Sequence, residues 1–321
     1  MNVVLVTGGA GYVGSHACKA LAGAGYLPVV YDNLTTGHRD LVRWGPLEEG
    51  DLLDDERLDA VFATHRPQAV LHFAALSVVG DSVREPERYR RNNVAGSLAL
   101  IAAMGRHGVG RLIFSSTAAV YGVPQVIPIT EETPLQPINP YGETKLAIEQ
   151  ALAASGLAWT ALRYFNAAGA DAQGDTGEHH VAESHLIPIV LDVALGRRPS
   201  ISVFGTDYDT PDGTCVRDYI HVTDLADAHL RALRRLEGGG ASAVFNLGTG
   251  QGTSVRQIID TVRQVTGHAI PVETGPRRPG DPPALVCSNA AAREALGWSP
   301  GRDTATQIAD AWRWHKARFG G

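Results

Sequence analysis

A tyrosine and a lysine four residues apart form the most informative pair in this sequence of 321 residues. Tyr141 and Lys145 stand at positions i and i+4, which lie on one face of an α-helix. Asn139 and Pro140 precede them and suit a helix start, because proline is tolerated in a first turn. A neighbouring ammonium lowers the pKa of a phenol from its usual value of about 10, so the pair predicts a general base.

Chance is the competing interpretation of this pair. The chain has three lysines, Lys19, Lys145 and Lys316, and otherwise uses arginine as its basic residue. With nine tyrosines, the spacing Tyr-x-x-x-Lys is expected by chance roughly 0.08 times. Arginine cannot replace the compact ammonium of lysine. A lysine at this position in an arginine-biased chain therefore favours chemistry over a solvated helix face.

Composition excludes several classes of protein. The formal net charge of −6 and the absence of dense Lys/Arg runs argue against nucleic acid as the main partner. Three separated cysteines, Cys18, Cys215 and Cys287, give neither a disulfide framework nor a Cys-x-x-Cys metal spacing. An apolar strand close to Met1 leaves no room for a signal peptide, and no apolar run reaches about 18 residues. We therefore expect a soluble cytoplasmic protein in a reducing compartment, without a membrane partner.

A glycine-rich turn follows the first apolar run. Residues 3–6 are continuous apolar and β-branched, which is typical of a strand buried on both faces. The turn fits Gly-x-Gly-x-x-Gly beginning at Gly9, or Gly-x-x-Gly-x-x-Gly beginning at Gly8, and both readings include Gly11 and Gly14. Such glycines permit a tight turn, close approach of a pyrophosphate to the backbone, and close packing of the next helix. The turn predicts a dinucleotide-binding site.

The residue at the end of the second strand indicates which dinucleotide binds. Residues 28–31 are apolar, and Asp32 follows them, 18 residues after Gly14. A carboxylate at this distance accepts the ribose hydroxyls of NAD and repels the 2′-phosphate of NADP. A lone glycine motif is weak evidence, but strand, turn, helix, strand and acidic residue stand here in the required order. The sequence therefore predicts NAD.

Hydroxyl residues follow a later predicted strand. The apolar run 111–114 ends in Ser115, Ser116 and Thr117. Ligands of open α/β sheets bind at the carboxyl ends of the strands, where these hydroxyls are expected. They are also ordinary turn residues. Thr117 is nevertheless the candidate for a third catalytic hydroxyl beside the tyrosine and lysine.

Other polar residues on this half of the chain have structural interpretations. His72 lies within an apolar run, and we interpret it as a core histidine with its hydrogen bonds satisfied. Ala74 and Ala75 follow that run and are small enough for a cofactor to approach, although they are equally good core residues. Asn92 is compatible with an N-cap of a helix expected over 94–107.

The order of elements predicts the fold. Strands and helices alternate up to residue 166, which indicates a Rossmann-type, doubly wound parallel sheet of the α/β class. We expect residues 1–166 to form an NAD-binding domain and residues 167–321 to form a smaller C-terminal α/β substrate-binding domain. A strand near 244–248 is expected to return to the first domain.

The chain changes character after the first domain. Residues 167–217 are rich in Gly, Pro, Asp and His. His179, His180 and His185 raise the possibility of a metal site, but no cysteine supports it and their spacing is not a helical i, i+4 pair. We predict that these histidines are solvated loop residues and that the protein holds no metal.

Taken together, these motifs resemble the extended short-chain dehydrogenases/reductases, and within them the UDP-glucose 4-epimerase family. The resemblance covers nearly the whole chain, and the joint order of the motifs is more specific than any one of them. The matching segments are residues 6–16, 32–34, 72–75, 114–117, 141–145, 162–166, 213–222 and 277–281.

The resemblance implies two sets of contacts and a homodimer. The NAD contacts would be Gly8, Gly11, Tyr12, Val13, Gly14, Asp32, Asn33, Leu34, Thr35, Thr36, Gly37, Asp51, Leu52, Phe73, Ala74, Ala75, Leu76, Ser77, Asn92, Lys145 and Phe165. The UDP-sugar contacts would be Thr117, Tyr141, Asn166, His185, Leu186, Phe204, Arg217, Val255, Arg278, Asp281 and Leu285.

The resemblance also implies a reaction. Tyr141 as a phenolate takes the proton of the 4′-hydroxyl while C4′ gives a hydride to NAD, and Lys145 holds the nicotinamide ribose. Thr117 hydrogen-bonds the sugar oxygen, and the 4-keto sugar turns over before the hydride returns to its other face. UDP-glucose and UDP-galactose are interconverted in this way, as part of galactose metabolism.

Two departures from the family concern the sugar. His185 stands where some members carry an Asn that binds substrate, and Leu285 stands where some carry a bulky Tyr. A roomier pocket that also accepts UDP-N-acetylhexosamines is a hypothesis from these residues.

Two alternative functions are consistent with this fold. A nucleotide-sugar 4,6-dehydratase resembles this chain but places an Asp-Glu pair just after Thr117, where this chain has Ala118 and Ala119. These alanines cannot move protons, which argues against dehydration. A catalytically inactive NAD-binding sensor or scaffold tends to lose the Tyr/Lys pair, and Tyr141 and Lys145 are both present.

Overall fold

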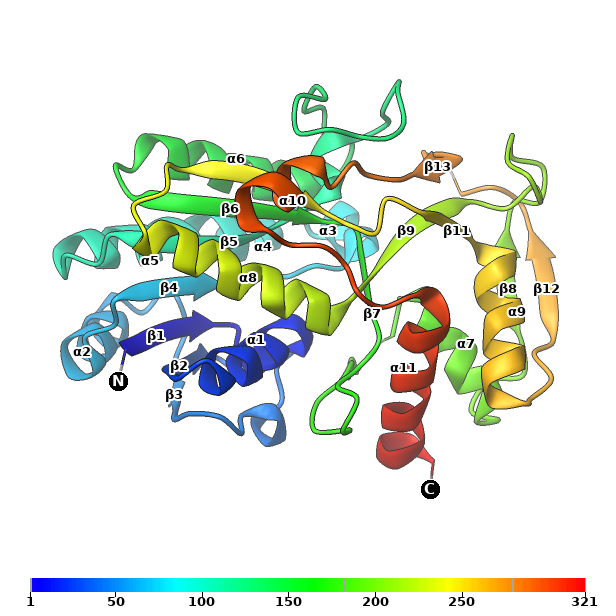
Figure 1. Ribbon diagram of the computed structural model, residues 1–321, viewed down its shortest axis with the longest axis horizontal. Coiled ribbons are helices and arrows are strands. Elements are labelled where there is room, and N and C mark those ends of the chain that lie inside the picture. Colours follow the sequence, from blue (N-terminus) through cyan, green and yellow to red (C-terminus); the bar gives the residue numbers. More distant parts are fainter. Residues whose placement is uncertain (1, 182, 279, 321) are drawn as a thin grey trace.

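A parallel sheet organises the larger part of the molecule (Figure 1). The computed structural model describes residues 2–181, 183–278 and 280–320, and in these residues seven strands pair in the order β10-β6-β5-β4-β1-β2-β3, all parallel. The strands are β1 (Asn2–Thr7), β2 (Tyr26–Asp32), β3 (Leu47–Glu49), β4 (Ala69–His72), β5 (Arg111–Thr117), β6 (Ala158–Tyr164) and β10 (Ala243–Leu247). The prediction of a Rossmann-type α/β fold is confirmed.

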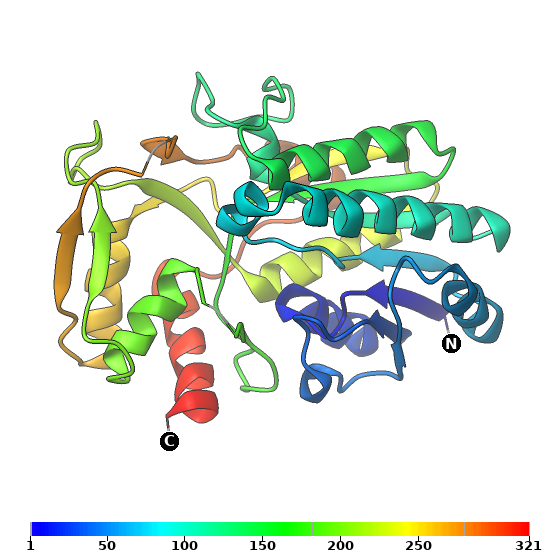
Figure 2. The ribbon, with the colours of Figure 1, turned by 180° about the vertical axis from the view of Figure 1, so that it is seen from behind.

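Helices cover both faces of this sheet. Side chains of α1 (Tyr12–Gly23) and α8 (Val222–Glu237) pack with Val4 and Val6 on one face, which is the nearer one in Figure 1. Side chains of α2 (Asp55–His65), α5 (Gly96–Arg106) and α6 (Pro140–Ala154) pack with Leu5 on the other face, seen in Figure 2. Successive residues of a strand point to opposite faces, so a strand buried on both sides must be apolar throughout.

The smaller part holds a second core. A four-stranded sheet contains β7 (Asn166–Ala168), β9 (Val216–His221), β11 (Gly252–Ser254) and β13 (Ala284–Leu285), and β8 (Ile201–Phe204) pairs with β12 (Val272–Gly275). Helices α7 (Leu186–Ala194), α9 (Val255–Thr266) and α11 (Thr304–Phe319) pack together beside these strands, on the right of Figure 1. Helix α9 begins with a reciprocal capping box formed by Ser254 and Gln257.

The chain crosses between the two parts more than once. The strand expected near 244–248 is β10, which pairs with β6 at the edge of the large sheet. Helix α8 and the short helix α10 (Ala290–Leu296) also pack on that sheet, although both come from the C-terminal half of the sequence. The division of the chain at residue 166 therefore stays a prediction about domains, and these later elements lie with the earlier ones.

One helix start was predicted wrongly. Helix α3 (Val79–Arg84) is followed by α4 (Pro86–Tyr89), the π-helical turn η2 (Arg90–Ala95) and α5, with no N-cap at Asn92. Proline opens α4, so the helical segment begins upstream of the asparagines. The π-turn orients Asn93, whose amide hydrogen-bonds the backbone N–H and carbonyl of Leu76 at 2.8 and 3.0 Å. Single-turn π-helical segments of this kind occur frequently at functional sites.

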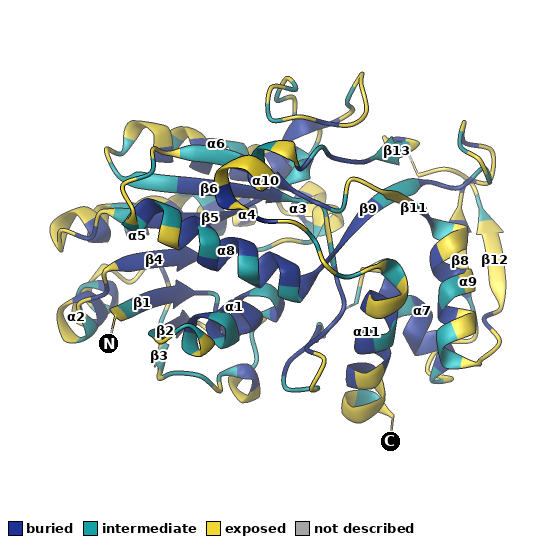
Figure 3. Ribbon diagram, viewed as in Figure 1, coloured by how far each residue is buried: buried dark blue, intermediate teal, exposed yellow. Residues whose placement is uncertain are grey.

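Burial follows the layers, with buried strands and exposed outer helix faces (Figure 3). Two short 3₁₀ turns, η1 (Arg39–Leu41) and η3 (Ala118–Tyr121), complete the elements. Among the described residues, no helix is both long enough and apolar enough to cross a membrane.

Candidate active site

The predicted NAD contacts gather along one edge of the large sheet. Because its strands are parallel, the segments that follow β1, β2, β3, β4, β5 and β6 all leave from the same edge. The glycine turn follows β1, residues 33–37 follow β2, Asp51 and Leu52 follow β3, residues 73–77 follow β4, and Phe165 follows β6. Asn92 lies in the π-turn and Lys145 in α6.

The backbone of the glycine turn is packed so closely that two of its glycines leave no room for a side chain. Gly8 has φ of 73°, and a Cβ there would lie 2.5 Å from the backbone N of Ala74. A Cβ on Gly14 would lie 2.2 Å from the carbonyl oxygen of Gly8. Gly11 is the N-cap residue of α1 and has no side chain that could cap the helix. The first-turn amides, which have no intrahelical acceptor in any helix, are therefore left without a side-chain acceptor from the N-cap. A helix N-terminus of this kind suits a diphosphate.

Asp32 is held in place by the backbone around it. Its carboxylate accepts hydrogen bonds from the N–H groups of Ala10 at 3.0 Å and Leu34 at 2.9 Å. Burial raises the pKa of Asp32, and the same two hydrogen bonds oppose the rise. Asn33 donates to Asp51 at 2.8 Å, which joins the ends of β2 and β3. The residues of this edge fit the diphosphate and the adenosine ribose of NAD.

Tyr141 and Lys145 lie in the first turns of α6. Asn139 caps the helix by accepting from the N–H of Gly142 at 2.9 Å. The Lys145 ammonium, 2% exposed, donates to the carbonyl oxygen of Ser115 at 2.8 Å and lies 5.9 Å from the centre of the Tyr141 ring. Burial lowers the pKa of Lys145 to about 7, against the effect of Glu149.

The pKa of Tyr141 differs from the prediction. Burial raises it to about 12, and a hydrogen bond with Thr117 lowers it less than burial raises it. The expectation that Lys145 lowers this pKa is therefore wrong for the protein alone. The physical reason is that the ammonium points to the Ser115 carbonyl, while desolvation of the phenolate is the larger effect.

Thr117 ends β5 and begins the turn η3. Its hydroxyl oxygen accepts from the N–H of Ala119 at 3.1 Å, which caps the turn. Ala118 and Ala119 present methyl groups next to Thr117, so this position holds no acid or base. The interpretation of His72 as a core histidine is confirmed, because its ring nitrogens each hydrogen-bond a buried hydroxyl at 2.7 Å.

Several predicted substrate contacts meet in the smaller part. The guanidinium of Arg278 lies 4.2 Å from the centre of the Phe204 ring, and Arg217 is paired with Asp281. Leu285 on β13 pairs in register with Arg217 on β9. Asn166 begins β7, Leu186 begins α7, and Val255 begins α9.

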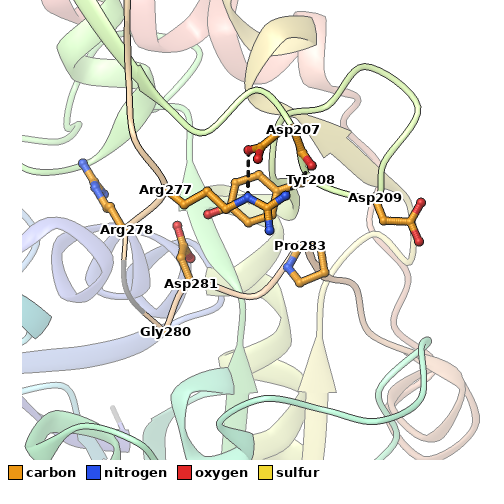
Figure 4. Close-up of a pocket in the computed structure, with 8 residues that line it drawn as sticks. All are labelled: Asp207, Tyr208, Asp209, Arg277, Arg278, Gly280, Asp281 and Pro283. Atoms are coloured by element: carbon orange, nitrogen blue, oxygen red, sulfur yellow. Dashed lines mark hydrogen bonds and ion pairs between the residues drawn. The ribbon is translucent and has the colours of Figure 1, made fainter.

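A cavity of about 750 Å³ lies beside this group (Figure 4). Arg277 points across it, hydrogen-bonded to Asp207 at 2.8 Å and placed 4.4 Å from the centre of the Tyr208 ring. Arg278 and Asp281 also line the cavity. Two guanidinium groups beside aromatic rings suit a ligand that combines negative charge with a flat base.

The histidines after residue 178 are not simply solvated. Glu178 is buried and hydrogen-bonds Nδ1 of His185, while Glu183 hydrogen-bonds Nδ1 of His180 at 3.2 Å. One donor atom from each of the four residues lies within 4.8 Å of the others, a grouping able to hold a metal ion, although the pairs already satisfy one another. The prediction of loop residues is confirmed, because His179, His180 and His185 lie outside helices and strands and His185 is exposed, but it missed the two glutamates that pair with His180 and His185.

The His–Glu pairs lead to a prediction about stability. Burial lowers the pKa of His185, but Glu178 outweighs burial and brings it from 6.5 to about 9. A raised pKa gives stability that is full below pH 6.5 and is lost as pH rises through about 9. We expect the urea midpoint of wild type to fall more over this range than that of Glu178→Gln. Replacing exposed His268 with Asn should keep the wild-type slope, and an identical slope in Glu178→Gln would refute the prediction.

Sequence reasoning also missed a buried ion pair between α6 and β6. Glu149 pairs with Arg163, and both are at most 5% exposed. The available signal was spacing, since Glu149 stands four residues after Lys145 and therefore on the same face of α6.

Comparisons with known proteins give consistent matches. Residues 4–248 match the model of the NAD dependent epimerase/dehydratase family. A curated protein of Rhizobium leguminosarum bv. trifolii named UDP-glucose 4-epimerase is 54% identical over 318 residues, covering 98% of this chain and 97% of that protein.

Solved structures agree with these sequence matches. UDP-glucose 4-epimerase from Brucella ovis in complex with NAD is 51% identical, with a TM-score of 0.95 and 98% of each chain covered. The enzyme from Bifidobacterium longum in complex with NAD⁺ and UDP is 38% identical, with a TM-score of 0.95 over 100% of both chains.

Proposed function

Since this chain belongs to the NAD dependent epimerase/dehydratase family, we propose that it interconverts UDP-glucose and UDP-galactose at C4 of the hexose. The observation that carries the proposal is the group of Tyr141, Thr117 and Lys145 at the sheet edge that also carries the NAD-type glycine turn. The enzyme is an NAD-dependent isomerase in which substrate and product differ at one stereocentre.

Each residue of the site has a separate role in the reaction. Bound NAD supplies a positive charge and a hydride acceptor and donor. Tyr141 exchanges a proton with the 4′-oxygen of the hexose, first as base and then as acid. Thr117 hydrogen-bonds Tyr141 and orients the sugar, and Lys145 supplies an ammonium next to the phenol. Because each proton transfer is reversed later in the cycle, Tyr141 ends in its starting state.

The substrate is anchored at its nucleotide end. Phe204, Arg217, Arg278 and Asp281 hold the UDP, with the guanidinium groups binding the diphosphate. An anchor remote from C4 leaves the keto sugar free to turn while it stays bound. The methyl groups of Ala118 and Ala119 leave the keto sugar without an acid–base pair for elimination of water, which separates this reaction from a 4,6-dehydratase.

Product identity tests the proposal. Incubation with UDP-galactose should produce UDP-glucose, followed by ¹H NMR of the anomeric and H4 signals. A 4-keto-6-deoxy product would instead indicate a dehydratase. No conversion of UDP-galactose or UDP-glucose by folded, NAD-containing protein would refute the proposal and favour a sensor or scaffold.

The sugar pocket gives a specificity prediction. Leu285 is partly buried and packs against the buried cluster of Val120, Tyr121 and Ile129, at a position where some relatives carry Tyr. We expect wild type to epimerise UDP-N-acetylglucosamine, and Leu285→Tyr to reduce that activity about 10-fold or more while largely preserving turnover of UDP-galactose. Leu285→Met is the control of similar volume. Equal loss on both substrates in Leu285→Tyr would contradict a role in sugar selection.

We propose a cytoplasmic homodimer packed through α5 and α6. Leu98 on α5 is 47% exposed, and we expect this side chain to be buried in such a dimer. Light scattering tests the stoichiometry, with about twice the chain mass expected. A monomer at working concentration would refute it.

A further inference from the structure

Glu149 lies on the same face of α6 as Tyr141 and Lys145, one helical turn after Lys145. These three residues follow one another at intervals of four, and Lys145 and Glu149 are both buried, at 2% and 5% exposure. The Glu149 carboxylate accepts from the Ser116 hydroxyl at 2.5 Å and from Nε of Arg163 at 2.9 Å. A second guanidinium nitrogen of Arg163 binds its other oxygen.

Arg163 extends these contacts across the sheet. It lies on β6 in register with Ser116 on β5, and it donates to the Tyr121 hydroxyl at 2.9 Å. Tyr121 in turn donates to the side-chain oxygen of Asn246 on β10 at 2.7 Å. One buried polar network therefore joins α6, the turn η3 and three neighbouring strands.

The last three residues of β5 connect this network to the reacting groups. The carbonyl of Ser115 accepts from Lys145, the hydroxyl of Ser116 donates to Glu149, and the side chain of Thr117 lowers the pKa of Tyr141. Movement of Glu149 would shift the strand end that positions both the ammonium and the threonine hydroxyl. Its carboxylate lies behind these groups and touches neither NAD nor sugar in the proposed mechanism.

Stability is a poor explanation for this arrangement. Buried ion pairs can often be replaced by apolar residues without loss of stability, since desolvation offsets the attraction between the charges. We propose that Glu149 is a positioning residue of the active site, whose carboxylate, fixed by Arg163 and Ser116, aligns α6 with the end of β5 and places a negative charge one helical turn from the Lys145 amine. This rests on the proposed epimerase function.

Electrostatics supports the same role. Tyr141 and Glu149 face Lys145 from its own helix, the Ser115 carbonyl faces it from β5, and His72 on β4 interacts with it electrostatically. Burial lowers the pKa of Lys145, and Glu149 raises it. Removal of the carboxylate therefore lowers this pKa further, and the amine loses its charge at a lower pH than in wild type.

Glu149→Gln tests the proposal in the NAD-loaded enzyme. We expect kcat for UDP-galactose to fall about 10- to 100-fold, the range typical of residues that orient catalytic groups, with KM changed less than about twofold because UDP provides the anchor. The alkaline limb of the kcat–pH profile should move down by about one pH unit. Glu143→Gln, an exposed substitution on the same helix, should match wild type.

A second variant controls for misfolding of Glu149→Gln. Glu149→Gln leaves Arg163 buried without its anion, so Glu149→Gln/Arg163→Met removes both charges. The double variant should fold and still show the lower kcat and the shifted alkaline limb. A wild-type pH profile in either folded variant, even with a lower kcat, would overturn the proposal and leave Glu149 a structural role.

Direct titration of Lys145 tests the role of Glu149 independently of the proposed epimerase activity. The chain has three lysines, so ¹³C-labelling of lysine Cε gives few signals, and Lys145→Arg assigns the one from Lys145. The Lys145 pKa should be lower in the variants than in wild type whether or not the enzyme turns over UDP-sugars. An unchanged pKa refutes the role of Glu149, whereas an inactive wild type with a shifted pKa refutes only the epimerase function.

Discussion

Tyr141→Phe protein is expected to turn over UDP-galactose about 10²- to 10⁴-fold more slowly than wild type, the range measured for general acid–base groups. The substitution removes the one hydroxyl that exchanges a proton with the 4′-oxygen, yet it keeps the ring that packs in α6. NAD content and the thermal midpoint should stay near wild type, because neither depends on that proton. Steady-state kinetics and extracted NAD per chain are the measurements.

A matched control separates this effect from the general loss of a tyrosine hydroxyl. Tyr26 opens β2 at the opposite end of the sheet, where its hydroxyl donates to Glu237 at 2.7 Å. Tyr26→Phe removes an equivalent group and should leave turnover within about twofold of wild type. Near-normal activity in Tyr141→Phe would eliminate Tyr141 as the acid–base group.

Gly8→Ala is expected to yield protein that has lost most of its bound NAD and is less stable. Left-handed backbone costs a residue with a Cβ about 1–2 kcal/mol, and here the added carbon also meets the backbone N of Ala74 at 2.5 Å. Relief of that contact would move the segment after β4 away from the glycine turn, and both segments are predicted to hold the cofactor. NAD per chain and the thermal midpoint measure the two effects.

Gly23→Ala provides the comparison for this substitution. Gly23 is exposed at the end of α1, and an added Cβ meets nothing within 4 Å among the described residues. Alanine there should be neutral or stabilise by up to about 1 kcal/mol, with full NAD content. Wild-type NAD content in Gly8→Ala would contradict the assignment of the turn to cofactor binding.

Features encoded by adjacent residues could be predicted from the sequence. The apolar run 3–6 specifies a strand buried on both faces, and the turn containing Gly8 and Gly14 follows it directly. The Tyr141–Lys145 spacing required only the 3.6-residue repeat of a helix. The parallel sheet then followed from the alternation of strands and helices.

Features that depend on distant partners could not be predicted in the same way. Arg217 pairs with Asp281, and Glu149 joins Arg163, Ser116 and Tyr121, through contacts that exist after the sheet has formed. The sign of the pKa shift at Tyr141 was missed for a related reason. Spacing reveals a neighbouring charge, whereas desolvation depends on everything packed around the group.

The most direct test of the central claim uses UDP-galactose carrying deuterium at C4, incubated in ordinary water with purified enzyme and no added NAD. We expect UDP-glucose that keeps the deuterium at C4, as measured by mass spectrometry and by the missing H4 signal in ¹H NMR. Retention follows because the atom removed from C4 is returned to the same carbon within one closed site. Loss of deuterium to solvent, or turnover that requires stoichiometric added NAD, would contradict the account.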